Sequence, residues 1–207
     1  MTGPARPMRG LVPLELAALV GIALVPMPIP RAIPLLGVAS VSRWLRGHSW
    51  GEVMHGRRDQ AGIAALAGVV ALVLALAVGT PVIELVSGRD VEWSQFPIVR
   101  GSAAQLFSVG LIVVLGVVAM ELVLRGWVVE RVLELRRGSA ALAVAVGALA
   151  EAAIVDGDVV ARAGGLVFGI ALGWLYIAAR RSAVAPICAR LTFSLIAIVL
   201  EALRLIG

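Results

Sequence analysis

The sequence contains no lysine, a single cysteine and only two histidines among its 207 residues. One cysteine, Cys188, excludes an intramolecular disulfide and a thiolate metal cluster. The histidines, His48 and His55, lie in a polar stretch beside Arg57 and Arg58, which indicates a solvated loop and not a zinc site. Charged residues make up only 15% of the chain, too few to cover an apolar soluble protein of this length.

Apolar residues dominate what is present. They account for 60% of the chain and the mean hydropathy is +1.00, which disfavours a soluble α/β protein with several buried strands. All 18 basic residues are arginines, and most lie in short segments between apolar runs. In a membrane protein such cationic loops set orientation and contact lipid headgroups. We interpret the net charge of +5 in this way and do not predict nucleic-acid binding.

The apolar runs predict membrane-crossing helices, because about 20 apolar residues are needed to span a bilayer. The chain has about seven such segments, at residues 11–29, 33–41, 61–86, 103–124, 140–154, 163–179 and 183–203. The second is short and precedes a polar stretch at 42–60, so we expect a half-helix or the returning arm of a hairpin. The fourth is expected to continue through Leu135. The prediction is an all-α, polytopic transmembrane helical bundle, with N-terminal membrane segments over 1–102 and a membrane core over 103–207.

Arginine placement predicts the orientation of this bundle. With a cytoplasmic N-terminus, the arginines at 43–58, 125–137 and 180–181 fall on the inner side, as the positive-inside rule requires. The first segment follows Arg6 and Arg9 without a clear cleavage site, so we expect it to be retained. The predicted location is the inner (plasma) membrane, with the N-terminus inside and the C-terminus outside. Four tryptophans are expected to act as interfacial anchors: Trp44, Trp50, Trp93 and Trp127.

Charged side chains also occur within the apolar segments, where each costs roughly 2.5–3.5 kcal/mol and needs a partner. Glu121 and Arg125 lie four residues apart, in the order that favours an ion pair on a helix. Glu151 has no nearby base in the sequence, whereas Arg190 shares a helix face with Ser194. The two glutamates and two arginines would balance in one buried network between three helices. This set does not fit a metal site, and we predict no cofactor.

A stripe of small residues marks one later helix. Gly165, Gly169 and Gly173 recur every four residues and therefore lie on one helix face. Such a small-xxx-small pattern allows two helices to approach closely in a membrane. We expect tight helix packing along this stripe, which says nothing specific about function.

Several stretches of the C-terminal half resemble a known family. Met120-Glu121-Leu-Val-Leu-Arg125-Gly126 is similar to the first motif, Glu-Glu-x-x-x-Arg, of the CPBP family of CAAX proteases and bacteriocin-processing enzymes, also called Abi. Residues 168–176 resemble its Gly-rich helix. Residues 182–194 resemble its last motif, in which a His is followed four residues later by Asn or Asp. The resemblance covers about residues 103–206 and implies the fold of an intramembrane metalloprotease core.

The departures from the family pattern fall on its catalytic residues. The family's first Glu, its general base, falls at Met120, and its Phe-x-x-x-His motif falls at Gly147 to Glu151, so that Glu151 replaces a His. Arg190 and Ser194 stand where the last motif has His and Asn. A thioether cannot accept a proton from water, and a guanidinium is neither a base nor a metal ligand. The resemblance thus implies the fold and argues against peptidase chemistry.

Three functions are consistent with these observations. The favoured one is a catalytically inactive CPBP homologue acting as a structural, scaffolding or regulatory subunit of a membrane complex, with membrane lipids and another membrane protein as partners. The second is an active intramembrane peptidase with an atypical site, in which Glu121 or Glu151 is the general base and Arg190 stabilises an oxyanion. The third is a lipid-binding or transport accessory protein that uses its buried charges as a relay. No internal repeat of the kind common in transporters is visible.

Overall fold

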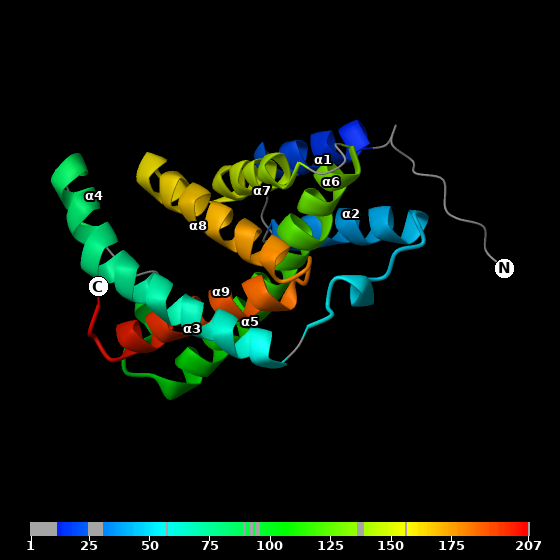
Figure 1. Ribbon diagram of the computed structural model, residues 1–207. Coiled ribbons are helices and arrows are strands. Elements are labelled where there is room, and N and C mark those ends of the chain that lie inside the picture. The colour runs from blue at the N-terminus through cyan, green and yellow to red at the C-terminus, as the bar shows by residue number, and fades with distance from the viewer. Residues whose placement is uncertain are drawn as a thin grey trace. The chain divides into compact units, whose positions relative to one another are not determined.

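The computed structural model describes residues 12–24, 31–56, 58–88, 90–91, 93, 96–135, 139–155 and 157–206. Over these residues the chain is helical without strands, which confirms the predicted all-α class (Figure 1). The helices are α1 (Val12–Leu24), α2 (Ala32–Leu45), α3 (Arg58–Leu74), α4 (Thr80–Ser87), α5 (Ala103–Val123), α6 (Glu130–Leu135), α7 (Ala140–Ile154), α8 (Val159–Ala178) and α9 (Val184–Ala202). A π-helical turn at Ala75–Gly79 joins α3 to α4, and a second at Leu124–Val129 joins α5 to α6.

Four of the helical rods are long and apolar enough to cross a membrane. They are Arg58–Ser87, Ala103–Leu135, Val159–Ala178 and Val184–Ala202. Three apolar helices are shorter, at Pro13–Ile22, Ala32–Leu45 and Ala140–Ile154. The 15 residues of α7 extend about 22 Å, less than the hydrocarbon core of a bilayer. The helices thus lie at the positions of the seven predicted segments. By length and composition, four of those described qualify as membrane spans.

Some expectations fall outside the described residues. Both ends of the first predicted segment lie there, together with Arg6 and Arg9 before it. Arg57, in the polar stretch after α2, lies there as well. Retention of the first segment therefore stays a prediction.

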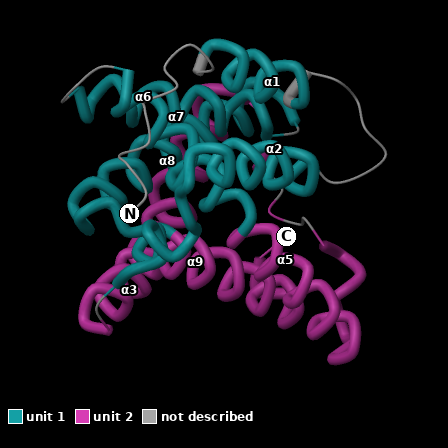
Figure 2. The backbone as a smooth tube through the Cα atoms, turned by 90° about the vertical axis from the view of Figure 1, so that its right-hand side faces the viewer, with its two compact units in different colours: residues 1–56, 119–186 teal, residues 57–118, 187–207 magenta. Residues whose placement is uncertain are grey.

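The fold divides into two compact units, each built from two separate stretches of chain (Figure 2). Unit 1 comprises Met1–Gly56 and Ala119–Pro186, and unit 2 comprises Arg57–Val118 and Ile187–Gly207. Helices α5 and α9 therefore contribute residues to both units. The predicted division at residue 102 is based on sequence motifs and on the order of membrane segments, whereas the two units are defined by packing. It therefore stays a prediction.

Unit 1 has a core formed by α1, α2, the second π turn and α7. Its buried centre includes Leu19 of α1, Leu35 of α2, Trp127 of the π turn and Ile154 of α7. Helices α7 and α8 pack against one another (Figure 1). The glycine stripe of α8 faces α7, since a Cβ atom added at any of its three positions would lie only 2.8–3.0 Å from α7 or its C-terminal cap. The stripe is thus used for packing within the chain.

Unit 2 contains α3, α4, most of α5 and most of α9. Gly68 of α3 lies against the backbone of α9, where an added Cβ would overlap the carbonyl of Ala189. Near the end of α9, the carboxylate of Glu201 accepts the backbone N–H of Phe96 at 3.1–3.2 Å and lies 3.9 Å from Arg100. The loop before α5 is therefore fastened to the last helix.

Two expectations from the sequence are wrong. Helix α2 extends to Leu45, so Ser42 and Arg43 lie in a helix and are buried, not part of a polar loop. Trp127 is not an interfacial anchor, because it is wholly buried and its indole N–H donates to the hydroxyl of Ser42 at 2.9 Å. Trp44, by contrast, is 74% exposed, as an anchor requires.

Candidate functional site

The first polar cluster of unit 1 is built on the π turn Leu124–Val129, every residue of which is buried. The turn carries Arg125 and Gly126 of the motif-like stretch. A π turn leaves the regular hydrogen-bond ladder of an α-helix, and such turns occur frequently at functional sites. Here the carbonyl of Gly126 accepts a hydrogen bond of 2.8 Å from Arg43 of α2. The turn therefore presents both a buried guanidinium and a main-chain acceptor to its surroundings.

Arg125 joins the two buried glutamates. Its Nε lies 3.2 Å from Oε2 of Glu121, and its Nη2 lies 2.8 Å from Oε2 of Glu151 on α7. Nη2 also donates to the carbonyl of Gly169 on α8 at 3.1 Å. The exposed fractions of Glu121, Arg125 and Glu151 are 0%, 1% and 0%. The pair four residues apart and the partner from another helix, both expected from the sequence, are present.

This cluster is closed to solvent. A general base must reach the proton of a bound water, at about 2.6–3.2 Å. Both carboxylates instead face a guanidinium, which donates hydrogen bonds and accepts none. Neither of the two cavities described below is lined by Glu121 or Glu151. The arrangement suits a structural ion-pair cluster that ties α5, α7 and α8 together.

A second buried network connects α1, α2 and the α5–α6 rod. Trp127 donates to Ser42, which donates to Glu15 at 2.6 Å. Arg46 donates to both carboxylate oxygens of Glu15 at 2.8 Å and to Glu134 at 3.3 Å. Sequence reasoning missed this network, because its members lie up to 119 residues apart, from Glu15 to Glu134. The available signal was Glu15, a charge inside an apolar segment that needs a partner.

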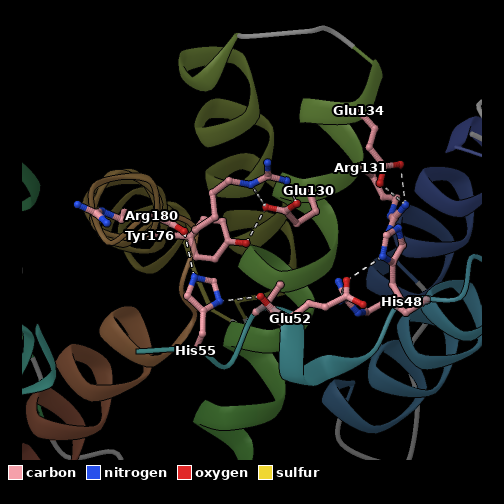
Figure 3. A pocket seen from close by; sticks show the side chains of 11 residues that line it. His48, Glu52, His55, Glu130, Arg131, Glu134, Tyr176 and Arg180 are labelled. Atoms are coloured by element: carbon pink, nitrogen blue, oxygen red, sulfur yellow. Dashed lines mark hydrogen bonds and ion pairs between the residues drawn. The ribbon is translucent and has the colours of Figure 1, made fainter. Parts of the chain in front are cut away.

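A polar cavity of about 310 Å³ lies in unit 1 beside this network (Figure 3). Its walls come from α2 and the loop after it, from α6, and from the end of α8 with the turn that follows. The lining residues are Arg43, His48, Glu52, Val53, His55, Glu130, Arg131, Glu134, Tyr176, Arg180 and Arg181. Four arginines and two histidines thus face three glutamates. The sequence placed these residues in separate segments, some in a polar stretch and others in predicted helices, and did not predict the cavity.

The carboxylates on the α6 side of the cavity are neutralised. Glu130 forms an ion pair with Arg181 and accepts the hydroxyl of Tyr176 at 2.7 Å (Figure 3). Hydrogen bonding to Glu130 raises the pKa of Arg181 above its ordinary value, so this guanidinium stays charged. Glu134 accepts two hydrogen bonds of 2.6–2.7 Å from Arg131.

The third carboxylate of the cavity, Glu52, lies in the short 3₁₀ turn Trp50–Glu52. It accepts the backbone N–H of Ser49 at 3.0 Å, in a capping box, and lies 2.8 Å from Nδ1 of His48. The Ser49 hydrogen bond lowers the pKa of Glu52 below its ordinary value, and His48 adds to the effect. Glu52 is therefore ionised at neutral pH and fixes the loop.

Two consecutive arginines terminate α8 in an unusual backbone conformation. Arg180 and Arg181 have φ angles of 57° and 65°, in the left-handed region that favours glycine. The N–H of Arg181 donates to Tyr176 at 2.9 Å and that of Arg180 to Ile177 at 3.1 Å, which is the Schellman pattern. A non-glycine residue in this conformation costs about 1–3 kcal/mol. Two cations at a helix C-terminus offset part of that cost.

This turn is fastened to the loop after α2. The N–H of Ala183 donates to Val53 at 2.7 Å, and the hydroxyl of Ser182 donates to the carbonyl of His55. His55 lies between two carbonyl oxygens, with Nδ1 2.7 Å from Glu52 and Nε2 3.2 Å from Arg180. We call these contacts the latch.

The remaining residues singled out in the sequence lie on α9, in unit 2. Ser194 lines a second cavity of about 140 Å³, together with Trp93, Phe96, Phe193 and Glu201. Arg190 is half-buried on the same helix. Its expected place in the Glu121–Arg125–Glu151 cluster stays a prediction.

No group of three or more His, Cys, Asp or Glu side chains within the described residues is arranged to hold a metal ion. Comparison with known proteins gives no family: no family model matches the chain, and no match is found among curated proteins or solved structures. The CPBP resemblance therefore stays a prediction.

Proposed function

We propose that this protein is a non-catalytic, CPBP-like membrane protein that acts as a structural, scaffolding or regulatory subunit of a membrane complex. The observation that carries this proposal is the closed Glu121–Arg125–Glu151 cluster. Two buried carboxylates share a guanidinium at 2.8–3.2 Å, which stabilises the contact of three helices. A scaffold needs such internal bracing, whereas a hydrolase needs a carboxylate that reaches water.

The alternative of an atypical Glu-based peptidase has weaker support. It requires Glu121 or Glu151 to act as a base, yet both are wholly buried. It also gives Arg190 the role of oxyanion donor, and that role rests on the motif alignment alone. A transport or lipid-binding role has the polar cavity of unit 1 in its favour.

We also propose an inner-membrane location with the N-terminus inside. Three segments assigned to the inner side by their arginines, the loop after α2, α6 and the turn after α8, line one cavity in unit 1. Contacts between segments assigned to the same side support this topology.

The test combines partner capture with a search for processing. The tagged chain, expressed at its native level, is purified in a gentle detergent and its partners are quantified. In parallel, membrane-protein processing is compared among wild-type, deletion, Glu121→Gln and Glu151→Gln cells, after size-exclusion chromatography establishes that both variants fold.

A partner at fixed stoichiometry, with unchanged processing in both folded variants, is the expected result. A substrate that accumulates uncleaved in the deletion strain and in both folded variants would instead make the protein a peptidase. Recovery of the chain alone, with no partner at fixed stoichiometry, would contradict the subunit role.

A further inference from the structure

Arg43 is a buried cation without a carboxylate at hydrogen-bond distance. Its side chain lines the cavity of unit 1, and the residue is only 3% exposed. Its Nη1 and Nη2 donate to the carbonyls of Gly126 and Ser49 at 2.8 and 2.5 Å, and its Nε has no partner. Its guanidinium also lies 4.8 Å from the ring centroid of Trp50. Carbonyls and a ring face solvate this charge without neutralising it.

Two of the three carboxylates of the cavity pair with other arginines, and the third, Glu52, forms only a loose ion pair with Arg43. Glu130 pairs with Arg181, and Glu134 pairs with Arg131. Glu52 lies 2.8 Å from His48 but 3.7 Å from Arg43, and its side chain is 48% exposed. A buried charge without a close counterion is expensive, and the energy is recovered when an anion binds. The cavity therefore has a surplus of positive charge next to Arg43.

A further cationic group, Arg180, lines the cavity at its exposed side. Arg180 is exposed, and no ion pair of its guanidinium occurs within the described part of the chain. In Figure 3 its side chain points away from Glu130 and Tyr176.

We propose that the unit 1 cavity binds a phosphate-type oxyanion, with Arg43 as its buried counterion and Arg180 at its mouth. Arginine guanidinium is the side chain best suited to phosphate oxygens, because its planar donors match them in pairs. The phosphate belongs either to an anionic lipid headgroup or to a free phosphate ion. A lipid source agrees with the proposed orientation, since the cationic side of the protein would face the cytoplasmic leaflet.

The test uses the full-length protein, purified in detergent in a buffer free of phosphate and stripped of lipid. Its unfolding temperature is followed by tryptophan fluorescence on addition of inorganic phosphate, of phosphatidylglycerol or of phosphatidylcholine in mixed micelles. Sodium chloride at matched ionic strength is the control for screening. At a ligand concentration 100-fold above Kd, we expect a rise of about 5–10 °C.

Three substitutions test which arginines cause the rise in unfolding temperature. Arg43→Gln removes the buried counterion and should abolish the shift. Arg180→Gln, at an exposed position that folding tolerates, should weaken apparent affinity about tenfold, which corresponds to one charge-assisted contact. Arg162→Gln is the matched control, because Arg162 is an exposed arginine of α8 outside the cavity. It should leave the shift unchanged.

The choice of ligands distinguishes a lipid headgroup from a free phosphate ion, and the controls show which results would overturn the proposal. A shift with phosphatidylglycerol alone identifies a lipid headgroup, and a shift with inorganic phosphate identifies the free ion. The proposal is overturned if neither probe shifts the wild type, or if chloride reproduces the shift. It is also overturned if Arg180→Gln matches Arg162→Gln, an outcome that can be read even where Arg43→Gln does not fold.

Discussion

At the residue scale, the stability of this protein depends on which groups contact each buried charge. Arg125 contacts Glu121 and Glu151 inside a helix cluster, whereas Arg43 is held by carbonyls. A charge that loses its partner in a low-dielectric interior keeps its full desolvation penalty. Substitutions in the closed cluster should therefore cost far more than substitutions of exposed charges.

Glu151→Ala should lower the free energy of unfolding by about 1.5–3 kcal/mol, because it removes the 2.8 Å contact of Arg125 with α7, while Arg125 keeps Glu121 as its counterion. The measurement is reversible unfolding in mixed micelles. The double variant Glu151→Ala/Arg125→Met should be less destabilised than the sum of the two single variants. Additive effects would show that the ion pair does not couple α5–α6 to α7.

The loop after α2 should loosen in acid. The pKa of Glu52 is lowered from its ordinary 4.5, so its contribution to loop stability is complete above pH 4.5 and is lost as the pH falls through the folded-state value. The protection factors for hydrogen exchange at residues 48–55, which correct for the intrinsic pH dependence of exchange, should fall in that range in the wild type. In Glu52→Gln, these protection factors should be lower already at neutral pH and should change little in acid. Similar acid profiles for the two proteins would contradict this role.

At the element scale, close approach of α7 and α8 determines how unit 1 is assembled. Gly169 faces the backbone of α7, where a Cβ would lie 2.8 Å from Cα of Ala148 and 3.0 Å from Oε2 of Glu151. Gly164, on the same helix, has nothing within 4 Å of its added Cβ. One helix thus offers a tight and an open glycine for the same substitution.

Gly169→Ala should destabilise the protein by about 1–3 kcal/mol, because the methyl group separates two packed backbones and displaces a cluster carboxylate. Gly164→Ala should stabilise it by up to about 1 kcal/mol through better helix propensity. Both are read from unfolding in mixed micelles. Equal effects of the two variants would mean that the stripe does not set the spacing of α7 and α8.

At the scale of the whole molecule, the proposed topology is tested with the lone cysteine removed. In a Cys188→Ala background, a cysteine at Ser49 or Arg204 is probed in intact cells with a membrane-impermeant maleimide. Arg204 lies beyond α9 and should label from outside, whereas Ser49, in the loop after α2, should label only after permeabilisation. The reverse pattern would invert the topology, and labelling of both from outside would mean an even number of crossings between them in place of the odd number that this topology requires.

Hydrophobic runs were enough to predict the helices, since the period and length of apolar segments are local properties. The Glu121–Arg125 pair was also predictable, because its spacing is that of one helical turn. The second network and the cavity were not, since they join Glu15 to Arg46 and the loop after α2 to residues 180–183 across long stretches of chain. The π turn, which buries Trp127, has no signal in composition.

The latch has a consequence for biogenesis. Its long-range hydrogen bonds join residues 125 to 130 positions apart, so the partners of residues 53–55 in the turn after α8 emerge from the ribosome well after the loop itself. During synthesis, residues 48–56 therefore wait unfastened beside the membrane while three long helices are inserted. The cavity is complete only after residues 180–183 have left the ribosome. This site is therefore one of the last parts of the protein to fold. A chain stalled before that point would hold most of its helices but no finished pocket.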